Sequence, residues 1–175
     1  LGVDIDFEDS IDNEWASLLI MKKMGLAVCH ATIELFEDQR VLVIERFDRS
    51  WKRFKDKDVL VRLPQEDLCQ ALGVSPHKKY QSEGGPGIKD IGAFLAASID
   101  ENDRQKFLKA LMVFDLLHAT DGHAKNFSIS LKPNGFRLTP FYDVMSGYFL
   151  AEREGVPYKN LKLAMKVGRT GYYAF

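Results

Sequence analysis

An apolar stretch of the chain leads directly into a polar one, and this change of pattern predicts a functional loop. Residues 107–117 are apolar nearly all round, which is typical of a helix buried in a domain core. Residues 127–131 alternate apolar and polar positions, as a half-buried strand does. Residues 118–126 lie between them and carry charged and amide side chains that a core has little use for. We therefore predict a rigidly mounted polar loop that faces a cleft.

The N-terminal pattern predicts one helix after an acidic, loop-like stretch over residues 4–10. A capping residue followed by an amphipathic run favours a helix over residues 10–24, stopped by the glycine that follows it. Leu18, Leu19 and Met21 are expected to face inward.

The middle of the chain predicts a hairpin, a basic turn and two helices. Two β-rich runs, 31–36 and 40–46, are separated by polar residues and predict a hairpin. Residues 49–53 are basic with one tryptophan and are interpreted as a solvated turn. A proline and acidic residues at the start of 64–73 favour a helix there. A glycine-rich turn at 84–87 precedes a further helix and lacks the P-loop pattern.

Composition and charge narrow the class of protein. The chain has 175 residues, of which 46% are hydrophobic and 28% charged, as in an ordinary soluble domain. A formal net charge of -1 excludes a global attraction to nucleic acid. Cys29 and Cys69 form neither a metal-spaced pair nor a disulfide framework, which suits a reducing cytosol. Without a long apolar run or signal peptide, the chain is expected to be cytoplasmic and to have no membrane partner.

The spacing within the polar loop predicts phosphoryl transfer. Asp121 and Asn126 reproduce the D-x-x-x-x-N pattern, in which the Asp receives the acceptor hydroxyl's proton and the Asn carbonyl oxygen holds magnesium. A carboxylate other than Asp121 must also bind the magnesium ion, and Asp143 is the candidate for this ligand. It follows the strand-like run 136–142, so a hairpin would return it beside Asn126. The alternative is a structural loop, because this short pattern alone is common.

The remaining polar residues of the loop allow a second interpretation. His118, Asp121 and His123 together are a candidate zinc or iron site, as in a metal-dependent hydrolase. No further histidine lies nearby in sequence. In the phosphoryl-transfer interpretation, His123 orients the loop by hydrogen bonding and Lys125 steadies the transferring phosphate electrostatically.

Two segments, residues 120–128 and 138–143, resemble the HipA family of bacterial serine/threonine kinases, the toxin halves of toxin–antitoxin pairs. Further HipA-like matches follow the family's order at residues 12–14, 45–49, 63–67, 84–87 and 161–165. The resemblance implies an α+β, protein-kinase-like fold with ATP and Mg²⁺ as cofactors. It also implies transfer of the γ-phosphoryl group to a protein serine, with an aminoacyl-tRNA synthetase as the suggested substrate.

The resemblance also assigns regions and binding residues. It implies that residues 1–48 are the end of a small lobe and that residues 49–175 are a mostly helical large lobe. Glu14 would pair with the lysine that grips the nucleotide phosphates, and the backbone groups of Glu45 and Phe47 would bind adenine. The alternatives are ordinary: Glu14 suits the first turn of its helix, and Glu45 and Phe47 suit the end of a strand.

In the family, a glycine-rich phosphate loop and the ATP-binding lysine precede the Glu14 helix, and more helices follow at the other end. Only a short acidic stretch precedes that helix here, and residues 168–175 finish in aromatic side chains. We therefore expect a fragment that is inactive by itself. The implied partner is a helix-turn-helix antitoxin, through which DNA is contacted indirectly. A catalytically inactive module that binds this antitoxin is the non-enzymatic alternative.

Overall fold

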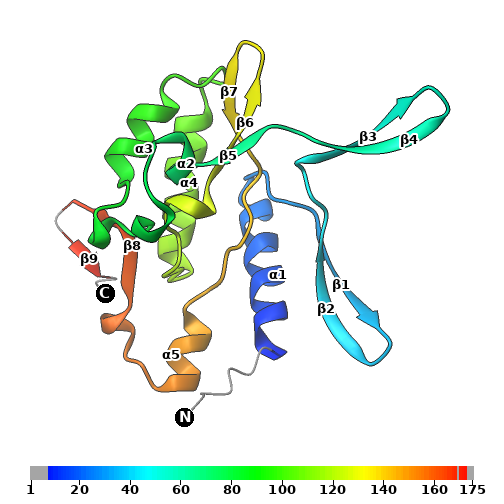
Figure 1. Cartoon of the computed structure of the whole chain (residues 1–175). Helices are drawn as coiled ribbons and strands as arrows, with labels where there is room; N and C mark the ends of the chain where they lie inside the picture. Colours follow the sequence, from blue (N-terminus) through cyan, green and yellow to red (C-terminus); the bar gives the residue numbers. More distant parts are fainter. Residues whose placement is uncertain (1–7, 169, 173–175) are drawn as a thin grey trace.

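The computed structural model describes residues 8–168 and 170–172, which form helices and antiparallel hairpins (Figure 1). The α-helices of these residues are α1 (Glu8–Lys23), α2 (Leu68–Ala71), α3 (Ile88–Leu95), α4 (Asp103–Leu116) and α5 (Tyr148–Glu154). The strands are β1 (Ala31–Phe36), β2 (Gln39–Ile44), β3 (Arg49–Phe54), β4 (Lys57–Arg62), β5 (Gln65–Asp67), β6 (Ser128–Lys132), β7 (Gly135–Leu138), β8 (Lys162–Val167) and β9 (Thr170–Tyr172). Short 3-10 turns occur at Pro76–Lys78, Gln81–Glu83, Ala124–Asn126 and Tyr158–Asn160. No helix of the described residues is both long and apolar enough to cross a bilayer.

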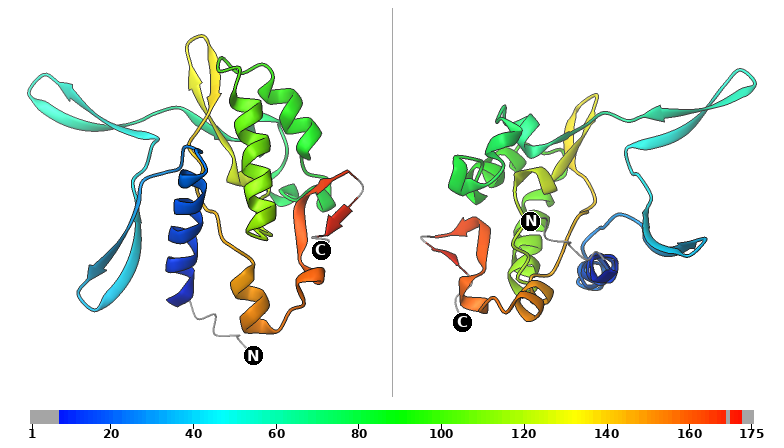
Figure 2. Two further views of the ribbon diagram at one scale, coloured as in Figure 1. Left: turned by 180° about the vertical axis from the view of Figure 1, so that it is seen from behind. Right: turned by 60° about the horizontal axis from the view of Figure 1, so that its bottom comes forward.

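The strands form small antiparallel sheets. The predicted hairpin is confirmed as β1–β2, in which Ala31 lies opposite Ile44. Strand β6 is central in the sheet β5–β6–β7, and β8 pairs with β9. Strand β7 ends at Leu138, ahead of Pro140, which confirms the prediction that this proline interrupts the strand-like run 136–142. Figures 1 and 2 show that the hairpin β3–β4 extends away from the helices, whereas β1–β2 lies beside α1, to which it is joined by the ion pair of Arg40 with Asp12.

The hairpin β3–β4 corrects the sequence interpretation of residues 49–53. These residues form strand β3 and not a solvated turn, with Arg49 opposite Arg62 and Phe54 opposite Lys57. The partner strand β4 contains a β-prone Val-Leu-Val run, which supplies a backbone ladder that the basic stretch alone does not reveal.

The predicted helix over residues 64–73 begins later than expected. Residues 65–67 form strand β5, which pairs with β6, because β6 offers them a complete antiparallel ladder. Helix α2 then begins at Leu68, where the Asp67 side chain accepts a hydrogen bond from the backbone N–H of Gln70 at 2.9 Å. Asp67 is therefore the cap of the helix and not a residue of its first turn.

Helix α1 starts earlier than predicted and buries a narrower face. It begins at Glu8, so the end of the expected loop is helical, while residues 4–7 lie outside the described residues. Leu18 and Met21 are buried as predicted. Leu19 is 38% exposed, because consecutive helical residues point about 100° apart.

Helix α4 is buried on one side only, so the prediction of burial all round is wrong. Phe107 and Val113 are fully buried in the core. Leu108, Met112 and Leu116 are four residues apart, share the opposite face and are exposed, Met112 to 69%. The apolar pattern therefore marks two faces, of which the described chain covers one.

Phe127 joins the elements that surround the polar loop. Its ring makes edge contacts with Phe107 of α4 at 5.0 Å between centroids and with Phe141 at 6.1 Å. Phe141 also accepts a backbone hydrogen bond from Cys29 at 2.8 Å, in the segment that follows α1. The core thus fixes α1, α4 and the start of β6 around residues 118–126 and 143.

Candidate active site

The polar loop, residues 118–126, is packed against helix α4. At its start, His118 adopts a left-handed φ of 51° and stacks on Tyr148, with ring centroids 4.5 Å apart. Further along, Gly122 lies so close to Phe114 that a Cβ atom there would come within 2.4 Å of the phenyl ring. A side chain at this position would have to displace a core aromatic ring, which explains the glycine. The tip of the loop is therefore held in place by α4.

Asp121 stands at this tip with its side chain 55% exposed. The Tyr80 hydroxyl donates a hydrogen bond to Oδ1 of Asp121. His123 Nε2 lies 3.6 Å from the same oxygen, which is beyond hydrogen-bond distance. The edge of the Tyr80 ring meets the His123 ring at 4.9 Å. Asp121 is thus open to solvent on one side and bounded by two aromatic rings on the other.

His123 is 4% exposed, and neither ring nitrogen has a hydrogen-bond partner in the part of the chain that the structure describes. The hydrogen bonds that His123 makes within the loop come from its backbone, whose N–H donates to the Asp121 carbonyl oxygen at 2.8 Å and whose carbonyl oxygen accepts from the Asn126 N–H at 3.0 Å. Burial lowers the pKa of the imidazole, and the nearby Asp121 carboxylate opposes that effect. A neutral imidazole offers one donor and one acceptor beside Asp121.

Asn126 and Asp143 meet as the sequence predicts. Nδ2 of Asn126 donates to Oδ2 of Asp143 at 2.9 Å and to its backbone oxygen at 3.2 Å. Oδ1 of Asn126 is buried, and no described residue donates a hydrogen bond to it. Asp143 has a left-handed φ of 56°. Burial raises the pKa of its carboxyl, and the Asp121 carboxylate adds to this rise because it repels a second negative charge.

Helix α1 brings Glu14 to the same place. Burial raises the pKa of the Glu14 carboxyl, and the Asp143 carboxylate raises it further, while the backbone N–H of Asp143 lowers it. Glu14 therefore lies beside Asp143, and since α1 begins at Glu8, it is not in the first turn of the helix, where the alternative interpretation placed it. Repulsion therefore links Asp143 to Glu14 and Asp121 to Asp143, although the three carboxylates do not form one cluster of ligands.

Asn13 ties α1 to the segment that carries Asp143. Its side chain donates to the backbone oxygen of Ser146 at 2.9 Å and accepts from the Ser146 N–H at 2.7 Å. Ser146 Oγ in turn donates to the backbone oxygen of Leu117 at the end of α4. These buried bonds connect α1, the Asp143 segment and the mount of the polar loop.

Lys125 has a carboxylate partner. Its Nζ lies 2.6 Å from Oδ2 of Asp67, the cap of helix α2. Its backbone oxygen accepts a hydrogen bond from the Tyr142 hydroxyl at 3.1 Å. The side chain is 35% exposed, so the ion pair orients it without enclosing it.

The predicted adenine-binding residues lie in the link between β2 and β3. The Glu45 backbone N–H donates to the His30 carbonyl oxygen at 2.9 Å, and the Glu45 side chain is 80% exposed. The Phe47 ring packs 5.8 Å from the ring of Tyr142, the neighbour of Asp143. The structure thus places this link close to the Asp143 segment.

The metal-hydrolase alternative is not supported by the geometry. His118 stacks on Tyr148 and points its Nδ1 at the Asp115 carbonyl oxygen at 3.0 Å, whereas His123 contacts Tyr80. Within residues 8–168 and 170–172, no three His, Cys, Asp or Glu side chains come together as metal ligands.

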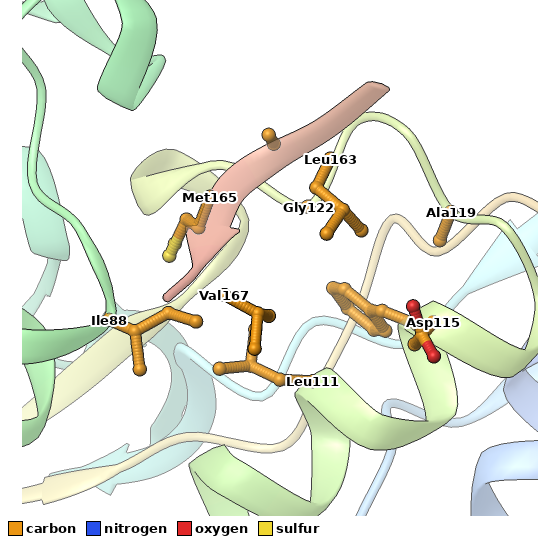
Figure 3. A pocket seen from close by; sticks show the side chains of 10 residues that line it. Ile88, Leu111, Asp115, Ala119, Gly122, Leu163, Met165 and Val167 are labelled. Atoms are coloured by element: carbon orange, nitrogen blue, oxygen red, sulfur yellow. The ribbon is translucent and has the colours of Figure 1, made fainter. Parts of the chain in front are cut away.

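Two small hollows flank the polar loop, each with about 30 Å³ of free volume. One is lined by Asp121, Asp143 and apolar neighbours. The other is lined by side chains of β8 and α4, and Figure 3 shows Leu163 of β8 next to Gly122 and Leu111 of α4 next to Val167 across the hollow. Strand β8, which overlaps the HipA-like segment 161–165, therefore packs against the polar loop.

Sequence reasoning missed several residues at the site: Asn13 as an anchor, Asp67, Lys79 and Tyr80. Lys79 lowers the pKa of Asp143 and of His123 by its positive charge. Tyr80 lies in a polar run ahead of the glycine-rich turn, and the pattern of that run gives no signal of a site. Contacts across the fold, and not local spacing, reveal these residues.

Comparison with known protein sequences connects this geometry to one family. A model of the HipA-like C-terminal domain matches residues 2–174. The putative kinase Y4mE of Sinorhizobium fredii is 35% identical over 168 residues, covering 93% of this chain and 37% of that protein. The serine/threonine-protein kinase toxin HipA of Shewanella oneidensis is 32% identical over 146 residues, covering 77% of this chain and 33% of the toxin. The chain spans about a third of the length of these relatives.

Solved structures give the same fold. The Shewanella oneidensis complex of HipA, HipB and operator DNA contains a chain that matches with a TM-score of 0.78 at 25% identity, covering 93% of this chain and 39% of that one. The Helicobacter pylori proinflammatory kinase CtkA matches with a TM-score of 0.62 at 12% identity, covering 93% and 59%. The fold is therefore α+β and kinase-like.

Proposed function

Since the chain belongs to the family of HipA-like C-terminal domains, we propose that it carries the metal-binding and acceptor-binding groups of a serine/threonine protein kinase. The proposed reaction transfers the γ-phosphoryl group of ATP to a serine hydroxyl of a protein. The kinase-like fold and the kinase names of the relatives support this reaction. In the proposal, residues 1–48 belong to the small lobe and residues 49–175 to the large lobe.

The observation that carries the proposal is the buried, unpartnered Oδ1 of Asn126 beside the carboxylate of Asp143. A buried oxygen without a hydrogen-bond partner costs folding free energy, and a bound donor or cation would remove this cost. Mg²⁺ prefers oxygen ligands, and in nucleotide sites it uses one or two protein carboxylates with phosphate and water. The Asn126 and Asp143 oxygens fit such a role, and a bound Mg²⁺ would neutralise charge on the triphosphate.

Asp121 is the base of the proposed reaction. As the serine oxygen attacks the γ-phosphorus, the Asp121 carboxylate accepts the hydroxyl proton. Its half-exposed position at the loop tip lets a hydroxyl on another protein reach it. His123 bounds it as a neutral ring, and Lys125, oriented by Asp67, stabilises negative charge on the transferring group.

Glu14, Glu45 and Phe47 complete the proposed nucleotide site. Glu14 pairs with a phosphate-gripping lysine, whose charge would offset the crowding that raises the pKa of Glu14 beside Asp143. The adenine edge presents a donor amino group next to an acceptor nitrogen. The Glu45 carbonyl oxygen and the Phe47 N–H are complementary to these groups, since the Glu45 N–H is already bound to His30.

The biological setting is also part of the proposal. A HipA toxin and its complex with HipB and operator DNA are among the similar proteins. We therefore extend to this chain a helix-turn-helix antitoxin as partner, with DNA contacted through it. A translation factor such as an aminoacyl-tRNA synthetase is the proposed protein substrate.

The proposed metal site is tested by calorimetry on the protein encoded by the complete reading frame. Asp143→Ala and Asn126→Ala should each abolish the magnesium-dependent part of ATP binding and leave the circular dichroism spectrum unchanged. Asp56→Ala removes a carboxylate in the remote turn between β3 and β4 and should bind Mg-ATP normally. Unchanged Mg-ATP affinity in both site variants would remove Asn126 and Asp143 from the site.

A further inference from the structure

The acceptor side of the proposed site already contains a hydroxyl group. A general base must lie within hydrogen-bond distance of the proton that it removes. In this structure the group in that position is the phenol of Tyr80, which donates to Oδ1 of Asp121. Tyr80 thus makes the contact that an incoming serine hydroxyl needs to make.

The chain holds Tyr80 there through contacts on both sides. Its ring lies edge-on to His123 at 4.9 Å. The next residue, Gln81, accepts a hydrogen bond from the backbone N–H of Lys166 in β8 at 2.7 Å. At Gly85, a Cβ atom would come within 2.2 Å of the Lys78 carbonyl oxygen, so the loop of residues 75–87 (the Tyr80 loop) closes tightly on itself. The placement of Tyr80 is therefore built into the loop.

The same loop is suited to moving aside. It consists of two short 3-10 turns between α2 and α3, and much of it is exposed. Gly84, with a φ of 88°, meets no atom within 4 Å of a Cβ position, so space surrounds the turn. Loops with few buried contacts open at low cost compared with core elements.

The phenol is a blocking group and not a reactive one. Burial raises the pKa of Tyr80, and the Asp121 carboxylate that accepts its hydrogen bond raises it further. The hydroxyl therefore remains a protonated donor, which occupies the base without competing for the phosphoryl group.

We propose that the space filled by the Tyr80 hydroxyl at Asp121 is the subsite for the acceptor hydroxyl, and that Tyr80 closes it until a protein serine displaces the Tyr80 loop. The inference rests on the proposed kinase function and deepens it. Before an acceptor protein binds, the Tyr80 hydroxyl takes the hydrogen-bonding position on Oδ1 of Asp121 that an attacking water would need, which limits wasteful hydrolysis of ATP.

Water is the probe for this subsite, because it is the smallest acceptor. The test measures Mg-ATP hydrolysis without protein substrate, in the protein encoded by the complete reading frame. Tyr80→Phe removes the hydroxyl and keeps the ring on His123, so hydrolysis should rise roughly tenfold, as expected for loss of one hydrogen bond to a charged group. Tyr148→Phe removes a hydroxyl from another partly exposed tyrosine that stacks on a histidine, and it should change nothing.

A second variant tests whether a rise in hydrolysis in Tyr80→Phe comes only from altered packing around the ring. Gln81→Ala frees the Tyr80 loop from β8 while Tyr80 stays intact, and it should raise hydrolysis in the same direction but less. Adding Asp121→Asn to either variant should remove the increase. A rate at or below wild type in both Tyr80→Phe and Gln81→Ala, with Mg-ATP affinity unchanged, would overturn the inference and leave the kinase proposal standing. Absence of any Asp121-dependent hydrolysis or phosphoryl transfer would overturn both.

Discussion

Asn126 donates its side-chain N–H to Oδ2 of Asp143 at 2.9 Å, although the two residues are 17 positions apart. The hairpin β6–β7 makes this contact possible, because it starts at Ser128, two residues after Asn126, and returns the chain towards Asp143. Thr139 fixes the return, since its N–H and its hydroxyl both donate to the Ser128 carbonyl oxygen. The register of one hairpin therefore sets the distance between the two proposed metal ligands.

The first prediction concerns the anchor of α1. Asn13→Ala removes both hydrogen bonds to the Ser146 backbone and should lower the free energy of unfolding by about 1 to 3 kcal/mol. Because Ser146 follows Asp143 closely, Mg-ATP affinity should fall as well. Asn13→Asp keeps the acceptor for the Ser146 N–H but loses the donor, so its effect should be intermediate. Denaturant titration and calorimetry measure both quantities, and full Mg-ATP affinity in Asn13→Ala would contradict this anchoring role.

A second prediction concerns a buried carboxylate at the start of α4. Asp103 is fully buried and accepts hydrogen bonds from Ser98 Oγ and the Leu138 N–H, each at 2.6 Å, and from Lys106 at 2.9 Å. Asp103→Ala leaves the Leu138 N–H without this acceptor and takes one of two partners each from Ser98 and Lys106, so it should cost about 3 kcal/mol in stability. The partner lysine also pairs with Asp100, which is more exposed, so Asp100→Ala should cost much less. Equal losses in urea titrations of the two variants would show that burial of Asp103 is not what matters.

The third prediction is a pH dependence. Hydrogen bonds from Arg46, and next from Arg49, hold the pKa of Asp48 below its usual value, although burial opposes them. The folded pKa is thus lower than the unfolded one, so the stabilisation is complete above the unfolded pKa of about 4 and declines as the pH falls towards the folded pKa.

Asp48→Asn should accordingly destabilise the protein by about 1 kcal/mol at neutral pH, with a smaller difference from wild type in strong acid. Urea titrations at both pH values measure this difference. A stability gap that grows on acidification would mean that the sign is wrong. Asp58→Asn, at the exposed pair with Arg53, is the matched control and should show little effect at either pH.

The sequence alone predicted those parts of the site that are formed by elements consecutive in the chain. Helix α4, the polar loop and the hairpin are consecutive in the chain, so the meeting of Asn126 with Asp143 followed from the pattern. The hairpin β1–β2 was predictable for the same reason.

Contacts between distant segments were not predictable in this way. Tyr80 reaches Asp121 across 41 positions and Lys125 reaches Asp67 across 58, and no periodicity encodes such pairs. Similarly, the apolar pattern of α4 gave no sign that Met112 would be exposed, because hydrophobicity alone does not say which face the described chain covers.

The central claim is that Asp121 is the base of a phosphoryl transfer, and one comparison tests it most directly. Radiolabel transfer from ATP to proteins of a bacterial extract is measured with the product of the complete reading frame and with its Asp121→Asn variant, alongside calorimetry of Mg-ATP binding. A base that acts on the acceptor alone should be needed for transfer and not for binding, so transfer should fall by about 100-fold or more while Mg-ATP affinity stays nearly constant. Transfer at the wild-type rate by Asp121→Asn would contradict the account.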